Sequence, residues 1–160
     1  MYRTEHDLVG EKQIDRGAYY GIHSLRAAEN FPITNQRLPG DMIVSMAWIK
    51  KACARANRMA GVLPERIANA IELACDDLIA GKLHDQFIVD PIQGGAGTST
   101  NMNANEVIAN RAIELLGGEK GDYSIVHPND HVNCGQSTND IYPTCVKMTL
   151  FRVSEGLLDG

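Results

Sequence analysis

Apolar residues recur at helical spacing in three successive segments of the chain, and a glycine follows each of them. The first segment runs from about Met42 to Met59, with Asp41 as the expected N-cap. The second covers residues 64–81 and the third covers residues 101–116. Glycine after a periodic segment is a frequent helix stop, because it adopts the left-handed conformation without a side-chain penalty. This pattern predicts a mainly α-helical fold.

The two ends of the chain differ from this central part. A fourth helix is expected from about Ser137, and Pro143 lies within its first two turns, where a missing N–H matters least. If that helix lacks packing partners, it should expose an apolar stripe made of Val146, Leu150, Val153 and Leu157. The first forty residues are interrupted by proline and glycine, so they are expected to be irregular, with brief strands or turns at most.

Composition excludes several classes of protein. Hydrophobic residues make up 44% of the 160 residues, and the net charge is −5 without a basic block, which argues against nucleic-acid binding. No apolar run approaches the ~18–20 residues that span a bilayer, and the polar N-terminal segment is not a secretory signal. The four cysteines form no CxxC pair and show no zinc-like spacing. A reducing cytoplasm is therefore the expected location.

Two of the predicted helices begin with stretches rich in hydroxyl and amide groups. These stretches are GGAGTSTN at 94–101 and QSTND at 136–140. A helix N-terminus carries unpaired N–H groups and about half a positive charge, so it can bind an anion where glycine leaves the backbone open. A flexible loop and ordinary N-capping are the alternatives for these residues. Capping accounts for one hydroxyl per helix, but not for successive Ser and Thr residues plus Asn at both helix starts.

Three segments resemble the aspartase/fumarase superfamily. They read EHDLVGEKQIDRGAYYGIHSLRAAENF at 5–31, GGAGTSTNMNANEVIANRA at 94–112 and HPNDHVNCGQSTNDIYPT at 127–144. Fumarases of this class typically read GSGTQSNMN and QSSND, whereas GAGTSTNMN and QSTND here are similar to aspartases. Cys134 and Gly135 depart from the family pattern, and this affects the expected geometry of the loop before QSTND.

The resemblance implies reversible elimination of ammonia from L-aspartate to give fumarate. Removal of the Cβ proton produces a dianionic enediolate, so the enzyme must bind a small dicarboxylate and stabilise extra charge at one end. Fixed hydrogen-bond donors at a helix N-terminus suit that purpose. The resemblance also implies a homotetramer, whose active sites each use three subunits. No cofactor is expected to be required, and activation of the full-length enzyme by a divalent metal such as Mg²⁺ is left open.

The family motifs assign site residues by position. Thr98 matches a substrate-contacting threonine, and Ser137, Thr138 and Asn139 match the run that holds the carboxylate where charge develops. A secondary or supporting site is expected from Arg26, His127, Asn129 and Asp130, although an ion pair for Arg26 and a structural loop for the others are equally open. The isolated histidines His6, His23 and His84 are interpreted as structural. No residues are assigned to a metal site.

The general base of the family is a serine in a GSSxMPxKxNP loop, and this sequence contains no such motif. Residues 1–136 are therefore predicted to form an N-terminal lyase domain, and 137–160 the start of a central helical bundle. The segment alone is predicted to be inactive, with its catalytic base beyond Gly160. The alternatives are a fumarate hydratase of the same superfamily and a non-catalytic helical binding or interaction module.

Overall fold

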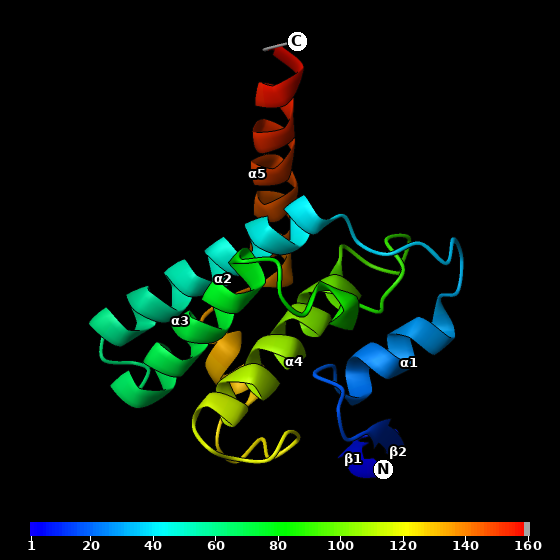
Figure 1. Cartoon of the computed structure of the whole chain (residues 1–160), viewed down its shortest axis with the longest axis vertical. Helices are drawn as coiled ribbons and strands as arrows, with labels where there is room; N and C mark the ends of the chain where they lie inside the picture. The colour runs from blue at the N-terminus through cyan, green and yellow to red at the C-terminus, as the bar shows by residue number, and fades with distance from the viewer. Residues whose placement is uncertain (159–160) are drawn as a thin grey trace.

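The computed structural model describes the backbone of residues 1–158 and the side chains of residues 1–154. The fold is mainly helical, as the sequence predicts, and a short hairpin precedes the helices (Figure 1). In chain order the elements are β1 (Tyr2–Asp7), β2 (Gly10–Asp15), α1 (Ile22–Asn30), α2 (Gly40–Met59), α3 (Glu65–Ile79), the 3-10 turn η1 (His84–Gln86), α4 (Thr98–Leu115), the π-helical turn η2 (Pro128–Val132) and α5 (Thr138–Leu158). Within residues 1–158, none of the helices combines the length and apolarity needed to cross a bilayer.

The core lies among α2, α3 and α4. Ala47 on α2, Ile71 on α3 and Ile108 on α4 are completely buried, together with several small alanines that allow the helices to approach closely. A fully buried isoleucine such as Ile71 or Ile108 contributes roughly 1.5–3 kcal/mol by removing apolar surface from water. The three predicted helices are therefore held by the apolar faces that the sequence shows.

Two helix starts differ from the predictions. The expected N-cap Asp41 lies inside the first turn of α2, because the helix begins at Gly40 with Pro39 in the capping position. α4 begins at Thr98 rather than near Asn101, because Gly97 adopts a positive φ of 85° and occupies the cap position. The TSTN residues therefore form the first turn of α4 instead of the loop before it.

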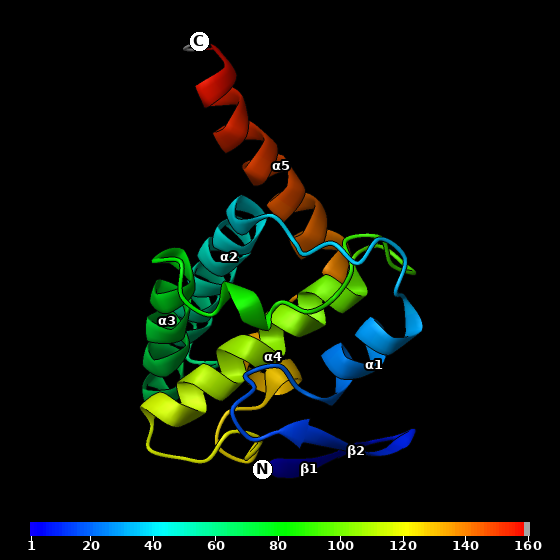
Figure 2. The same cartoon turned by 45° about the vertical axis from the view of Figure 1, so that its right-hand side comes forward.

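The expectation of irregular structure is wrong for residues 2–15 and 22–30. β1 and β2, of six residues each, form an antiparallel hairpin with Tyr2 opposite Asp15, and α1 follows as a nine-residue helix. Figure 2 shows the hairpin below α1 and α4. The hairpin is anchored by Arg3, whose guanidinium donates to the Glu5 carboxylate at 2.8 Å and to three backbone carbonyls. Polar contacts between distant residues produce no regular spacing of apolar residues. The spacing of apolar residues therefore did not predict the hairpin.

α5 packs against α2 and α4 over its first turns and then extends away from the domain (Figure 1). Ile141 and Cys145 are buried, and Val146 is half-buried against the core. Leu150 and Val153 are exposed, as expected for the apolar stripe, whereas the Leu157 side chain lies outside the described residues. The predicted division of the chain after residue 136 stays a prediction.

Candidate functional site

The two hydroxyl-rich helix starts lie next to each other. Asn101, in the first turn of α4, donates from Nδ2 to the Oγ1 atom of Thr138, the first residue of α5, over 3.1 Å. Figure 2 shows the start of α5 beside the N-terminal end of α4. Ser137 precedes α5, and its Oγ accepts from the Asn139 backbone N–H at 3.2 Å. The partial positive charges of two helix N-termini therefore lie in one region.

The glycine-rich stretch is a folded turn rather than a free loop. Gln93 closes it by accepting from the Thr100 backbone N–H at 2.9 Å and donating to the Thr100 hydroxyl at 2.8 Å. At the end of the turn, Gly97 lies against the ring of Tyr142 on α5, so closely that a Cβ there would be 2.2 Å from the ring. Glycine at this position lets the two helix starts meet.

Replacement of Gly97 by alanine should therefore destabilise the chain. The left-handed φ of 85° disfavours any Cβ, and the new methyl group would overlap the Tyr142 ring. We expect a loss of roughly 2–3 kcal/mol in the free energy of unfolding, from left-handed strain and overpacking together. Urea unfolding followed by circular dichroism measures it. The control is Gly61→Ala, which has φ of 72° but no atom within 4 Å of the added Cβ. Equal losses in both variants would contradict the packing argument.

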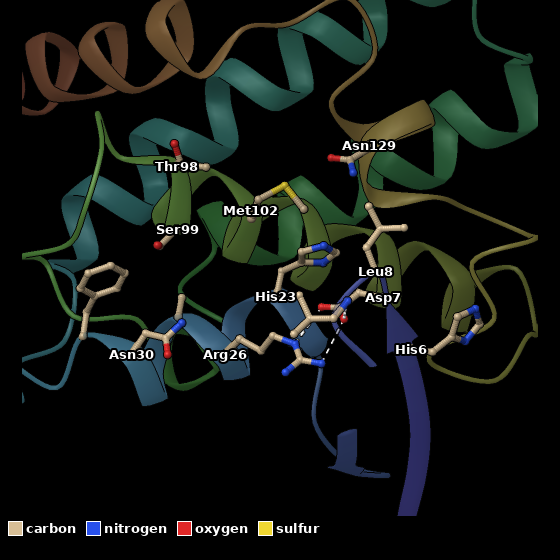
Figure 3. Close-up of a pocket in the computed structure, with 13 residues that line it drawn as sticks. His6, Asp7, Leu8, His23, Arg26, Asn30, Thr98, Ser99, Met102 and Asn129 are labelled. Atoms are coloured by element: carbon tan, nitrogen blue, oxygen red, sulfur yellow. Dashed lines mark hydrogen bonds and ion pairs between the residues drawn. The ribbon is translucent and has the colours of Figure 1, made fainter. Parts of the chain in front are cut away.

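A cavity of about 790 Å³ lies beside the first turn of α4 (Figure 3). It brings together three residues that the sequence assigns to the site, namely Thr98 and, from the supporting set, Arg26 and Asn129. The wall also contains Asp7, His23 and Met102. Ser137, Thr138 and Asn139 are not among its lining residues, so the predicted residues occupy two adjoining regions.

Arg26 makes the ion pair that the sequence analysis left open. Its guanidinium donates to the Asp7 carboxylate at 2.8 and 3.0 Å, and Figure 3 shows this pair among the residues that line the cavity. The Arg26 hydrogen bonds keep the pKa of the Asp7 carboxyl below its usual value. Asp7 thus offsets the charge of Arg26 at this wall.

His23 supplies a second basic group. Its Nδ1 lies 3.1 Å from Oε1 of the buried Glu106 carboxylate on α4, and this hydrogen bond raises the pKa of the imidazole. Burial acts in the opposite direction, whereas the nearby carboxylates of Asp7 and Glu5 also raise the pKa. With Nδ1 held by Glu106, Nε2 is the ring nitrogen left for a ligand.

The raised pKa predicts a pH dependence of stability. The folded-state pKa of His23 exceeds the value of about 6.5 in an unfolded chain. The stabilising contact with Glu106 is therefore fully present below pH 6.5 and is lost as pH rises through the folded-state pKa. We expect His23→Gln to remove this component from the pH profile of the unfolding free energy. An NMR titration placing the His23 pKa below 6.5 would contradict the assignment.

The HPND residues form the turn η2. His127 is the cap of this turn, because its Nδ1 accepts from the backbone N–H groups of Asn129 and Asp130 at 3.2 and 3.1 Å. Asp130 is largely exposed and lies 3.4 Å from His127. Only Asn129 of the three also lines the cavity. The geometry gives His127 a structural task in the turn, and the binding role of this region stays a prediction.

Sequence reasoning missed three polar residues near this region. His23 was interpreted as structural, and neither Glu106 nor Lys50 was singled out. Lys50 is completely buried, and burial lowers the pKa of its ammonium group to about 7. Its Nζ donates to Asn133 Oδ1 at 2.9 Å and to Gln136 Oε1 at 2.8 Å. A lysine at a core position of a helical pattern was the available signal.

A cluster of three or more metal-ligating side chains is not found among the residues that the structure describes. The polar groups at the helix starts are instead hydroxyls and amides, which can each donate a hydrogen bond to a carboxylate. Together with the positive ends of the two helix dipoles, they suit a small anion.

The chain is similar to known proteins over almost its whole length. The family described as Lyase matches residues 10–159, almost the whole chain. The chain belongs to this lyase family. Aspartate ammonia-lyase of Bacillus subtilis is 56% identical over 98% of the chain, and that of Escherichia coli K12 is 48% identical over 99%. The chain spans about a third of the length of these lyases, 33% and 34% respectively.

Solved structures of the lyase family share the fold. A structure described as fumarate lyase:delta crystallin from Brucella melitensis has a TM-score of 0.93 and 54% identity, over 94% of this chain and 36% of that one. Class II fumarase from Schistosoma mansoni has a TM-score of 0.88 and 36% identity, over 93% of this chain and 32% of that one. The predicted helical fold and the resemblance to the superfamily are confirmed.

Proposed function

We propose that the chain is the N-terminal segment of an aspartate ammonia-lyase, which reversibly eliminates ammonia from L-aspartate to give fumarate. The observation that supports this most is the contact between the starts of α4 and α5, through the 3.1 Å hydrogen bond from Asn101 to Thr138. Identities of 48% and 56% to aspartate ammonia-lyases favour this activity over a fumarate hydratase. The fumarase at 36% identity matches less well.

In the proposed reaction, the helix starts hold the carboxylate next to the carbon that loses a proton. Thr98, Ser137 and Thr138 donate hydroxyl hydrogen bonds, and Asn139 adds its side-chain amide. Negative charge on this carboxylate increases as the enediolate forms, so donors fixed in advance stabilise the transition state more than the substrate. Gly97 in the preceding turn leaves room for the Tyr142 ring, so that the two helix starts can lie together.

The neighbouring cavity is proposed as the supporting site. Arg26 and Asn129 line it, and His127 and Asp130 shape the turn that carries Asn129. We further propose that the full-length enzyme is a cytoplasmic homotetramer that needs no cofactor for the chemical step, with Mg²⁺ as a candidate activator. A general base from another part of the polypeptide must remove the Cβ proton.

Product analysis tests the proposed reaction. The full-length protein is incubated with fumarate and ammonium, and the products are read by proton NMR. Aspartate is the expected product. Malate would show that water is added instead, as in a fumarate hydratase. Neither product would favour a binding module that keeps the fold and lacks this chemistry.

The 160-residue chain alone is expected to give no turnover. The described helix starts supply donors for a carboxylate, but the sequence contains no GSSxMPxKxNP motif for the expected base. The purified chain is assayed with aspartate by following fumarate absorbance, beside the full-length protein as the positive control. Turnover by the short chain would contradict this prediction.

A further inference from the structure

Lys50 lies at the base of a chain of hydrogen bonds that ends at Thr138. Its Nζ donates to the side-chain oxygens of Asn133 and Gln136, in the loop just before α5. The same Asn133 oxygen also accepts from Asn101 Nδ2 at 3.1 Å. The second contact of that amide nitrogen is the Thr138 hydroxyl oxygen. Lys50 is thus connected to a residue of the proposed carboxylate site through two asparagines.

The cation determines the direction of every bond in this chain. A lysine ammonium has donors and no acceptor, so Asn133 and Gln136 must both turn their carbonyl oxygens towards it. The amide of Asn133 then donates to the Gln136 backbone carbonyl at 3.1 Å.

The orientation of Asn133 also fixes the donors and acceptors of the hydrogen bonds that lead to Thr138. Because the Asn133 oxygen is fixed as an acceptor, Asn101 must present its NH₂ group to both neighbours. This orientation leaves the buried Asn101 Oδ1 without a hydrogen-bond partner among the described residues, which is unfavourable by itself. The opposite orientation would place two amide oxygens against each other. The bonds to Asn133 and Thr138 therefore determine the orientation of Asn101.

At Thr138 the hydroxyl oxygen accepts one hydrogen bond, from Asn101 Nδ2. Its own hydrogen has no acceptor among the residues that the structure describes, and it remains available at the start of α5. A fixed donor needs no reorientation as charge develops on the substrate.

We propose that Lys50 is a positioning residue, which fixes this hydrogen-bond chain so that the Thr138 hydroxyl donates to the bound carboxylate. The inference rests on the proposed function for the identity of the carboxylate. Lys50 does not touch the substrate, and it acts through Asn133, Asn101 and Thr138. Lys50 is buried, and within the described part of the chain no carboxylate lies at ion-pair distance from its Nζ. It therefore does not serve as one half of a buried ion pair there.

A double-mutant cycle in the full-length enzyme tests the proposal. Lys50→Met is expected to lower kcat for aspartate by about 10- to 100-fold with a smaller change in KM, less than removal of an oxyanion donor would. In a Thr138→Val background the same Lys50 substitution should change kcat less than about twofold, because no hydroxyl remains to be oriented. An equal loss in both backgrounds, or no loss in the single variant, would overturn the proposal.

Two further variants keep the test decisive. Lys51→Met is the matched control, because the neighbouring Lys51 instead pairs with Asp76 at 2.5 Å on α3 and should leave kcat unchanged. If Lys50→Met does not fold, Asn101→Leu removes the link to Thr138, and the same non-additivity with Thr138→Val is expected.

Failure of the proposed function would be visible separately, as absence of lyase activity in the unmodified enzyme. The cycle is then measured with fumarate as the probe, by calorimetric binding affinity. Coupling between the two substitutions supports the proposal, and additivity overturns it.

Discussion

Thr138→Val in the full-length enzyme should lower kcat for aspartate by about 10²–10³-fold, the usual effect of removing one oxyanion donor. Valine keeps the shape of threonine and removes only the hydroxyl. Thr138 begins α5 and accepts from Asn101 at 3.1 Å, so its own hydrogen is available to the ligand. We expect KM to change less than kcat, because the lost hydrogen bond strengthens as charge develops on the substrate. Steady-state kinetics of fumarate release measure both constants.

The same helix provides a control for Thr138→Val. Thr144 is exposed, and its hydroxyl donates to the Asp140 backbone carbonyl within α5 at 2.6 Å. Thr144→Val should therefore leave kcat and KM unchanged. A similar loss of kcat in both variants would show that valine disturbs α5 in general, and would contradict a specific role of Thr138.

Glu106→Leu should be the most destabilising single substitution considered. The Glu106 carboxylate is buried in α4 and accepts from the backbone N–H groups of Gly21, His23 and Ser24 at 2.9–3.1 Å. It also accepts from the Ser24 hydroxyl at 2.5 Å. These N–H groups lie at the start of α1, where they have no acceptor within the helix and where no side chain of the N-cap residue bonds them. Each buried donor left without an acceptor costs about 1–3 kcal/mol, and water that enters the site offsets part of this cost. We therefore expect the free energy of unfolding to fall by roughly 3–5 kcal/mol.

Urea unfolding of the chain measures this loss. Glu119→Gln serves as the control, because Glu119 is exposed and forms a surface ion pair with Arg16, so little change is expected. Hydrogen exchange should also show that the amides of α1 lose protection first in Glu106→Leu. Full retention of α1 protection would contradict the capping role.

A helix could be predicted from the sequence when its own residues show an apolar face, and not when it depends on contacts with residues far along the chain. α2, α3 and α4 carry their own apolar faces, so local spacing was enough to find them within a few residues. α1 was missed, because its N-terminal N–H groups are satisfied by Glu106 on α4, more than 80 residues further along the chain. The contacts of Lys50 could not be predicted for the same reason, since Asn133 is 83 residues away along the chain.

The candidate site was predictable in part for the same reason. Successive hydroxyl residues at two helix starts indicated an anion site, and the structure shows these starts in contact through Asn101 and Thr138. The cavity beside them required the hairpin and α1, neither of which was expected. His23 was therefore dismissed as an isolated histidine, although its ring nitrogen is held by Glu106 at the cavity wall.

The central claim is that the paired starts of α4 and α5 hold the reacting carboxylate. A crystal structure of the full-length enzyme with fumarate bound tests it most directly. We expect one fumarate carboxylate within hydrogen-bond distance of the Thr98 and Thr138 hydroxyls. A fumarate held only in the cavity by Arg26 and His23, with both helix starts empty, would contradict it.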